Sequence, residues 1–186
     1  MRKLLSITLI MIGSFTFANP LVDAAKQRLE HVVIYDGSYQ KIPYPMGDVD
    51  ASKGVCTDVI IRSYRVLGVD LQELVHEDMV SNFKLYPSIW GLNKPDSNID
   101  HRRVPNLEMF FSRFGKTKTI TTNPVDYRPG DIVTWRLTGS NLPHIGIVSD
   151  QKAASGNYQI IHNIGMGPQM NDMLFEHPIT GHFSYR

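Results

Sequence analysis

The stretch GVCTDVIIRSYRVLG, residues 54–68, contains the only cysteine of the chain, Cys56. Gly54 permits a sharp turn before the cysteine, and Gly68 is a natural end for the helix that the intervening apolar residues predict. The residues at helical spacing that we expect on its buried face are Val59, Ile60, Ser63 and Leu67. Cys56 then stands at the first turn, where backbone N–H groups without intrahelical partners favour a negative charge. This position suits an activated thiolate as well as an inert, buried thiol.

The N-terminal sequence MRKLLSITLIMIGSFTFANP has the features of an export signal, with Arg2 and Lys3 before an apolar run and small residues up to Ala18. We therefore expect a signal peptide over residues 1–18 and a periplasmic or secreted chain over residues 19–186, with no membrane attachment after cleavage. An uncleaved N-terminal anchor is the alternative. Exported proteins usually carry cysteines in pairs, so a lone cysteine is buried, bonded to another chain, or kept for its chemistry.

Composition excludes several classes of function. A chain of 186 residues, 42% of them hydrophobic, suits one domain with a core of its own. The formal net charge of +1 gives no reason to expect a nucleic-acid partner. Neither an HExxH motif nor a paired-cysteine spacing is present, so we expect no metal and no cofactor, although Cys56 and histidines brought close to it could ligate zinc by proximity. The sequence carries no signal for the oligomeric state.

The order of the expected elements indicates the fold class. Helical patterns come first, over residues 21–34, within 70–87, where one or two short helices are expected, and over 102–115. Short β-rich segments follow, in DIVTWRL, HIGIVSD, YQIIHNIG and HFSYR. Helices followed by strands predict an α+β domain in which an antiparallel sheet packs against helices.

A cysteine nucleophile needs a base, and two of the seven histidines lie where strands would hold them rigidly. His144 opens one expected strand and His162 lies at the end of the next. Adjacent antiparallel strands bring the start of one beside the end of the other, so His162 could orient the ring of His144 as the third member of a triad does. Asn163 faces the opposite side of a regular strand.

Several of these segments together resemble a known family. GVCTD opening a helix, then RPGDIVTW, PHIGIVSD and IIHNIG, is similar to the NlpC-type cell-wall peptidases, a papain-like group. The resemblance implies a papain-like fold, Cys56 as nucleophile, His144 as base, His162 as the orienting residue, and a turn at residues 129–131. More closely, GVCTDV, YPSIWGL, PDSNIDHRRVPNLEMFF and ITGHFSY resemble the bacterial family known as domain of unknown function 1287, over about residues 26–186.

The chain departs from the compact NlpC pattern in one region. A helical insert at about residues 69–128 separates the cysteine helix from the turn, and it contains the polar cluster PDSNIDHRRVPN. Arg102 or Arg103 could bind a substrate carboxylate through two parallel hydrogen bonds, or the cluster could be a salt-bridged loop that caps the next helix. The remaining substrate-binding candidates are Asp58, which could equally stabilise the helix start, Asn163, and Tyr44, one of three tyrosines with Tyr35 and Tyr39 that could line a cleft.

These observations predict an exported cysteine amidase or peptidase that cleaves an amide bond through an acyl-enzyme. The resemblance implies peptidoglycan stem peptides as the substrate. Two alternatives stay open: an acyltransferase that uses the same thioester chemistry, and a non-catalytic cell-wall binding module.

Overall fold

The computed structural model describes residues 19–186, so the expected signal over residues 1–18 lies outside the described part of the chain. Within that part lie four α-helices: α1 (Pro20–Gln27), α2 (Cys56–Val66), α3 (Leu71–Asn82) and α4 (Val104–Phe114). Short 3-10 helices are η1 (Arg28–Glu30), η2 (Phe83–Leu85), η3 (Asp100–Arg102) and η4 (Pro124–Asp126). The strands are β1 (Ile34–Tyr35), β2 (Lys53–Gly54), β3 (Lys116–Thr117), β4 (Ile132–Arg136), β5 (Pro143–Lys152), β6 (Tyr158–Asn163), β7 (Pro168–Asn171) and β8 (Ile179–Ser184).

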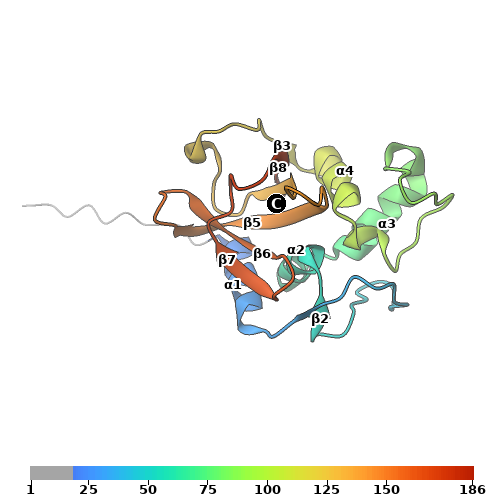
Figure 1. The fold of residues 1–186 in the computed structure, drawn as a ribbon. Coiled ribbons are helices and arrows are strands. Elements are labelled where there is room, and N and C mark those ends of the chain that lie inside the picture. The colour runs from blue at the N-terminus through green and yellow to red at the C-terminus, as the bar shows by residue number, and fades with distance from the viewer. Residues whose placement is uncertain (1–18) are drawn as a thin grey trace, which may run out of the picture.

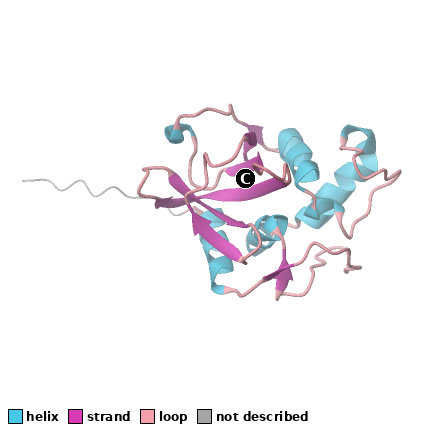
Figure 2. Ribbon diagram, viewed as in Figure 1, coloured by secondary structure: helices cyan, strands magenta, loops and turns pink. Residues whose placement is uncertain are grey.

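The main sheet has six strands in the order β3-β8-β4-β5-β6-β7, and every neighbouring pair runs antiparallel. Helices α1 and α2 lie along one face of this sheet, and α4 and α3 lie at one end of β5 (Figure 1). Figure 2 shows the segregation of the long helices from the strands. The fold is therefore mixed α+β with an antiparallel sheet, which confirms that part of the prediction.

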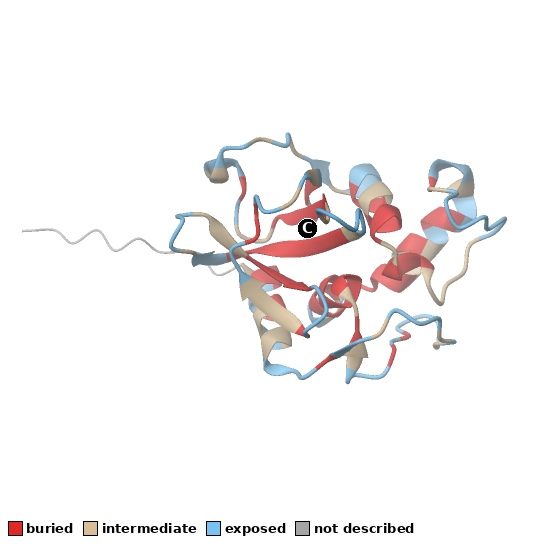
Figure 3. Ribbon diagram, viewed as in Figure 1, coloured by how far each residue is buried: buried red, intermediate tan, exposed pale blue. Residues whose placement is uncertain are grey.

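The central strands separate two apolar clusters. Alternate residues of β5, such as Ile145 and Ile147, face α2 and the larger cluster. Val148 faces the smaller cluster on the other side, which Trp135 and Leu174 help to fill. Strands β4 and β5 are buried over most of their length (Figure 3). Because both sides are covered, the start of β5 has little freedom to shift, which matters for the residue that opens it.

One predicted element ends earlier than expected, and one strand was not predicted. The first helix ends at Gln27 and η1 follows it, because the β-branched run from Val32 to Ile34 favours extended chain; Val32 is 92% exposed. The glycine-rich segment after β6, for which no strand was predicted, returns as strand β7. Gly165 and Gly167 adopt φ angles of 133° and 88°, which allow the chain to reverse there.

No helix in residues 19–186 is both long enough and apolar enough to cross a membrane. The region over residues 69–128 contains α3, η3, α4, β3 and η4. Its description as an insert relative to more compact domains stays a prediction.

Candidate functional site

Cys56 is the first residue of α2 and is only 4% exposed. The helix begins there because Val55, the residue before it, has extended backbone and its amide donates to Oδ2 of Asp58 at 2.6 Å. Val55 has no side-chain oxygen, so Asp58 alone supplies the side-chain cap at this end. The cysteine therefore sits on a helix start whose geometry one carboxylate fixes.

Asp58 is itself held by a buried arginine. Nε and Nη2 of Arg102 each donate to an oxygen of this carboxylate at 2.9 Å, and the two side chains are 2% and 3% exposed. The carbonyl of Arg102 also accepts the hydroxyl of Thr57 at 3.0 Å. The ion pair thus fastens the first turn of α2 to η3, and the predicted two-bond grip of Arg102 on a carboxylate occurs within the chain.

Tyr35 lies beside the cysteine. It belongs to β1, which pairs in parallel with β2 so that Tyr35 aligns with Gly54, two residues before Cys56. The hydroxyl of Tyr35 and the backbone amides of Thr57 and Ile145 face the sulfur, where their polar hydrogens favour the thiolate. The sulfur therefore lies next to the backbone of β5 at the residue that follows His144.

The two predicted histidines are directly bonded to each other. Nε2 of His144 lies 2.9 Å from Nδ1 of His162, and Nε2 of His162 lies 2.8 Å from Oδ1 of Asn171. Because Oδ1 accepts, Nε2 of His162 carries a proton; its Nδ1 then accepts from Nε2 of a neutral His144. This arrangement leaves Nδ1 of His144 as an unprotonated acceptor, and no other hydrogen bond engages this ring within residues 19–186.

Burial decides the charge of both the Cys56 thiol and the His144 ring. It raises the pKa of the Cys56 thiol to about 12, against the opposing effect of the amide of Ile145. Burial, followed by the neighbouring His162 and His177, lowers the pKa of His144 to about 3, and burial also lowers the pKa of His162. The expected activation of the thiol by the helix start is thus outweighed, and the resting pair is a neutral thiol with a neutral imidazole.

Cys56 and His144 line the same groove, which has a volume of about 370 Å³. Most of its exposed wall is apolar, contributed by Trp90, Leu142 and Ile164 among others. Arg103 also lines it: its guanidinium stacks 4.1 Å from the ring centroid of Trp90, and its Nη1 is 3.4 Å from Asp100. The groove therefore joins an apolar wall, the guanidinium of Arg103 and the thiol.

The other predicted substrate-binding residues are not brought together in this groove. Arg102 touches it but is already bound to Asp58, which lies outside the lining. Tyr44 packs edge-on against His76, with ring centroids 5.1 Å apart. Asn163 lines a different cavity. Of the five candidates, only Arg103 offers the groove a polar group that is not committed to a two-bond ion pair.

Asn171 and Trp90 were missed by the sequence reasoning, and Tyr35 was noted only as one of three tyrosines. The alternation of Gln169 and Asn171 after a Gly-Pro turn is the signal that could have indicated β7. For Trp90 no local signal exists, because its place depends on the packing of the loop before η3. Within residues 19–186, no group of three or more histidine, cysteine, aspartate or glutamate side chains is arranged to hold a metal ion.

Two comparisons with known proteins each cover nearly all of the described chain. Residues 22–185 match the family described as "Domain of unknown function (DUF1287)". The "Uncharacterized protein YijF" of Escherichia coli (strain K12) is 53% identical over 165 residues, which cover 89% of this chain and 80% of that protein. Neither description includes an activity.

The neutral state of His144 makes stability depend on pH. Between about pH 6.5, the ordinary pKa, and about pH 3 the unfolded chain binds more protons at this ring than the folded chain does. The free energy of unfolding is therefore expected to fall as pH falls through this window, by at most about 1.4 kcal/mol per pH unit for the one group. Urea unfolding followed by tryptophan fluorescence at several pH values should show a weaker dependence in His144→Gln. Equal dependence in both proteins would contradict the assignment.

The pair of Asp58 and Arg102 predicts a large effect on stability. Asp58→Ala leaves a buried guanidinium without a counter-charge, which should lower the free energy of unfolding by about 3–5 kcal/mol. The double variant Asp58→Ala/Arg102→Leu removes that charge and should recover part of the loss. Asp150→Ala is the matched control, because it breaks the exposed ion pair with Lys26 and should cost less than about 1 kcal/mol. Similar losses in Asp58→Ala and Asp150→Ala would refute this role.

Proposed function

We propose that this chain, which belongs to the DUF1287 family, is an exported cysteine amidase or peptidase with Cys56 as nucleophile, His144 as base and His162 as orienting residue. The observation that carries the proposal is the ordered row from Asn171 through His162 to His144, which ends in an acceptor nitrogen on a ring that shares a groove with Cys56. A buried row of imidazoles with one unpaired acceptor nitrogen lowers the stability of the fold, so packing alone does not account for it.

The reaction would proceed with neutral groups. As the sulfur attacks the carbonyl carbon of the substrate, Nδ1 of His144 takes the thiol proton, so no free thiolate accumulates. The imidazolium then donates through Nε2 to His162, which Asn171 holds in the required tautomer. Backbone amides at the start of α2 and the hydroxyl of Tyr35 are donors close to the sulfur, suited to the oxyanion.

Breakdown of the tetrahedral intermediate releases an amine. The C–N bond breaks, His144 returns its proton to the leaving nitrogen, and a thioester remains on Cys56. A water molecule deprotonated by His144 then attacks the thioester, releasing a carboxylic acid and restoring the thiol. The peptidoglycan stem peptide is the substrate that the resemblance to NlpC-type peptidases suggests, and a papain-like fold belongs to the same proposal.

A cleavage assay on purified peptidoglycan, read by mass spectrometry of the released fragments, tests this function. Cys56→Ala should abolish release, and His144→Gln should reduce the rate by about 10²–10⁴-fold. Asn171→Ala should cost less, because it acts through His162, whereas Asn157→Ala on the neighbouring exposed turn is the matched control and should have no effect. Release by Cys56→Ala at the wild-type rate would refute the proposal.

One observation favours acyl transfer as a second candidate. The apolar wall of the groove, including Leu142 and Ile164, limits the access of water to a thioester on Cys56 and leaves room for another acceptor. Adding a primary amine to the assay distinguishes the two reactions. A transferase should convert a large part of the product to the amide of the added amine, whereas a hydrolase should give the free acid alone.

A further inference from the structure

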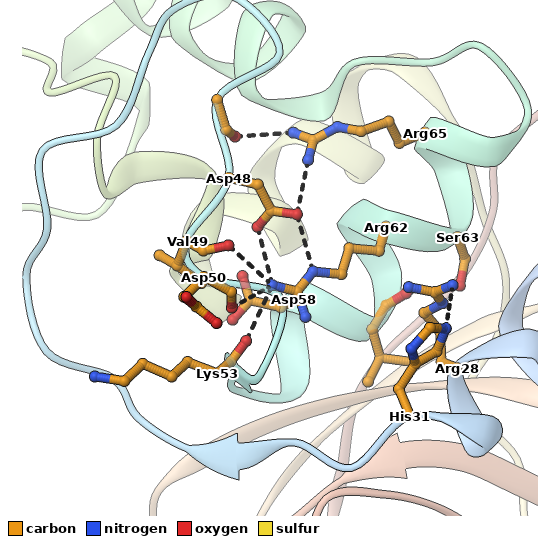
Figure 4. Close-up of polar contacts among 12 residues, drawn as sticks. Arg28, His31, Asp48, Val49, Asp50, Lys53, Asp58, Arg62, Ser63 and Arg65 are labelled. Atoms are coloured by element: carbon orange, nitrogen blue, oxygen red, sulfur yellow. Dashed lines mark hydrogen bonds and ion pairs between the residues drawn. The ribbon is translucent and has the colours of Figure 1, made fainter.

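A second and smaller cavity lies against the first two turns of α2. Its volume is about 10 Å³, which is close to the space that one water molecule or small ion needs. Its lining shares only Val55 with that of the groove at Cys56. Four of the polar residues that line it, Arg28, His31, Asp58 and Arg62, are labelled in Figure 4.

Three nitrogen donors lining this cavity have no partner within residues 19–186. Nε of Arg28 and Nδ2 of Asn163 are fully buried and make no hydrogen bond. Arg62 uses Nε and Nη2 to bind Asp48 and the carbonyls of Val49, Asp50 and Lys53 (Figure 4), so Nη1 is left over. Buried donors without acceptors are rare in folded proteins, so the two buried nitrogens together with the spare Nη1 of Arg62 point to an acceptor between them.

The orientation of Asn163 is fixed. Its Oδ1 accepts the backbone amide of Gly165 at 3.1 Å, and an amide nitrogen could not replace it there. Nδ2 is therefore the atom left unpaired. The side chain is 1% exposed, so solvent outside the cavity does not reach it.

The charges near the cavity are unequal. Arg28 and Arg62 bring two guanidinium groups, and Nη2 of Arg28 contacts only the ring of His31, at 3.0 Å. Asp48 is shared between Arg62 and Arg65, and Asp58 is bound to Arg102 through two bonds. Burial, followed by the charge of Arg62, lowers the pKa of Arg28, as expected for a guanidinium that lacks a full counter-charge.

We propose that this cavity binds a single small monoanion of halide size, chloride under ordinary conditions, between Arg28, Arg62 and Asn163. The anion would connect the start of η1, the second turn of α2 and the last residue of β6. Because Asn163 directly follows His162, the same ion would hold the end of β6 from the side opposite the imidazole row. The inference concerns binding and stability, and it does not depend on the proposed function.

Two measurements on the full chain test the site. Crystals grown or soaked in bromide should give an anomalous peak in the cavity. In solution, chloride and bromide should raise the Tm by about 2–5 °C over gluconate at equal ionic strength, with saturation at high halide concentration. Asn163→Asp places a carboxylate in the cavity and should fold with a Tm that no longer responds to halide. Arg136→Gln, at a half-buried ion pair with Glu108, is the matched control and should keep the response.

Clear outcomes would overturn the proposal. A water molecule without anomalous signal in bromide-grown crystals, together with equal Tm values in chloride and gluconate, excludes an anion. If Asn163→Asp does not fold, Arg28→Gln removes one of the three donors and should weaken the halide response at least tenfold in apparent affinity. A response of unchanged size and midpoint in Arg28→Gln would also refute the site.

Discussion

The buried ion pair between Asp58 and Arg102 is the constraint on which the rest of the site depends. One carboxylate caps the amide before Cys56, neutralises Arg102, and so fixes where α2 begins. Arg102 in turn donates to the carbonyl of Asp36, next to Tyr35, so the same pair holds the segment that carries the tyrosine. Because neither charge can be removed alone without leaving the other buried, the first turn of α2, η3 and β1 are stabilised as one unit. This unit therefore fixes the position of the Cys56 thiol.

That position removes the thiol from water, and the loss of hydration affects its protonation state. A helix start and three polar hydrogens favour the thiolate, but they do not overcome the loss of hydration, so the sulfur stays protonated at rest. A permanently ionised, exposed cysteine is oxidised readily, since reactivity toward oxidants follows thiolate character. Under the proposed mechanism, the thiol would lose its proton only to a neighbouring imidazole during attack, which would avoid such oxidation. The low pKa of His144 and the raised pKa of Cys56 thus describe one resting state, in which both groups are neutral.

Much of this arrangement could be predicted from sequence, for identifiable reasons. The helix from Cys56 and the strands that carry His144 and His162 follow from strong local patterns, and antiparallel pairing brings the ends of neighbouring strands together. The alternation around Asn171 is only a weak signal, because β7 is a short strand in a glycine-rich segment whose pairing, rather than its own propensity, makes it a strand. The sequence also left open whether Arg102 binds a substrate carboxylate or an internal one, since a bidentate arginine looks the same in sequence in both cases. The raised pKa of Cys56 depends on three-dimensional burial and has no local signature.

The alternation of side chains along β6 explains why two sites can lie so close together without merging. His162 faces His144, and the next residue, Asn163, faces α2 and the small cavity. A one-residue shift of β6 would exchange these faces, placing an amide in the imidazole row and an imidazole among arginines. The bond from Gly165 to Asn163 and the pairing of β6 with β7 both oppose such a shift. An anion between Arg28, Arg62 and Asn163 would oppose it as well, so the polar cavity behind the strand and the row of histidines in front of it select the same register.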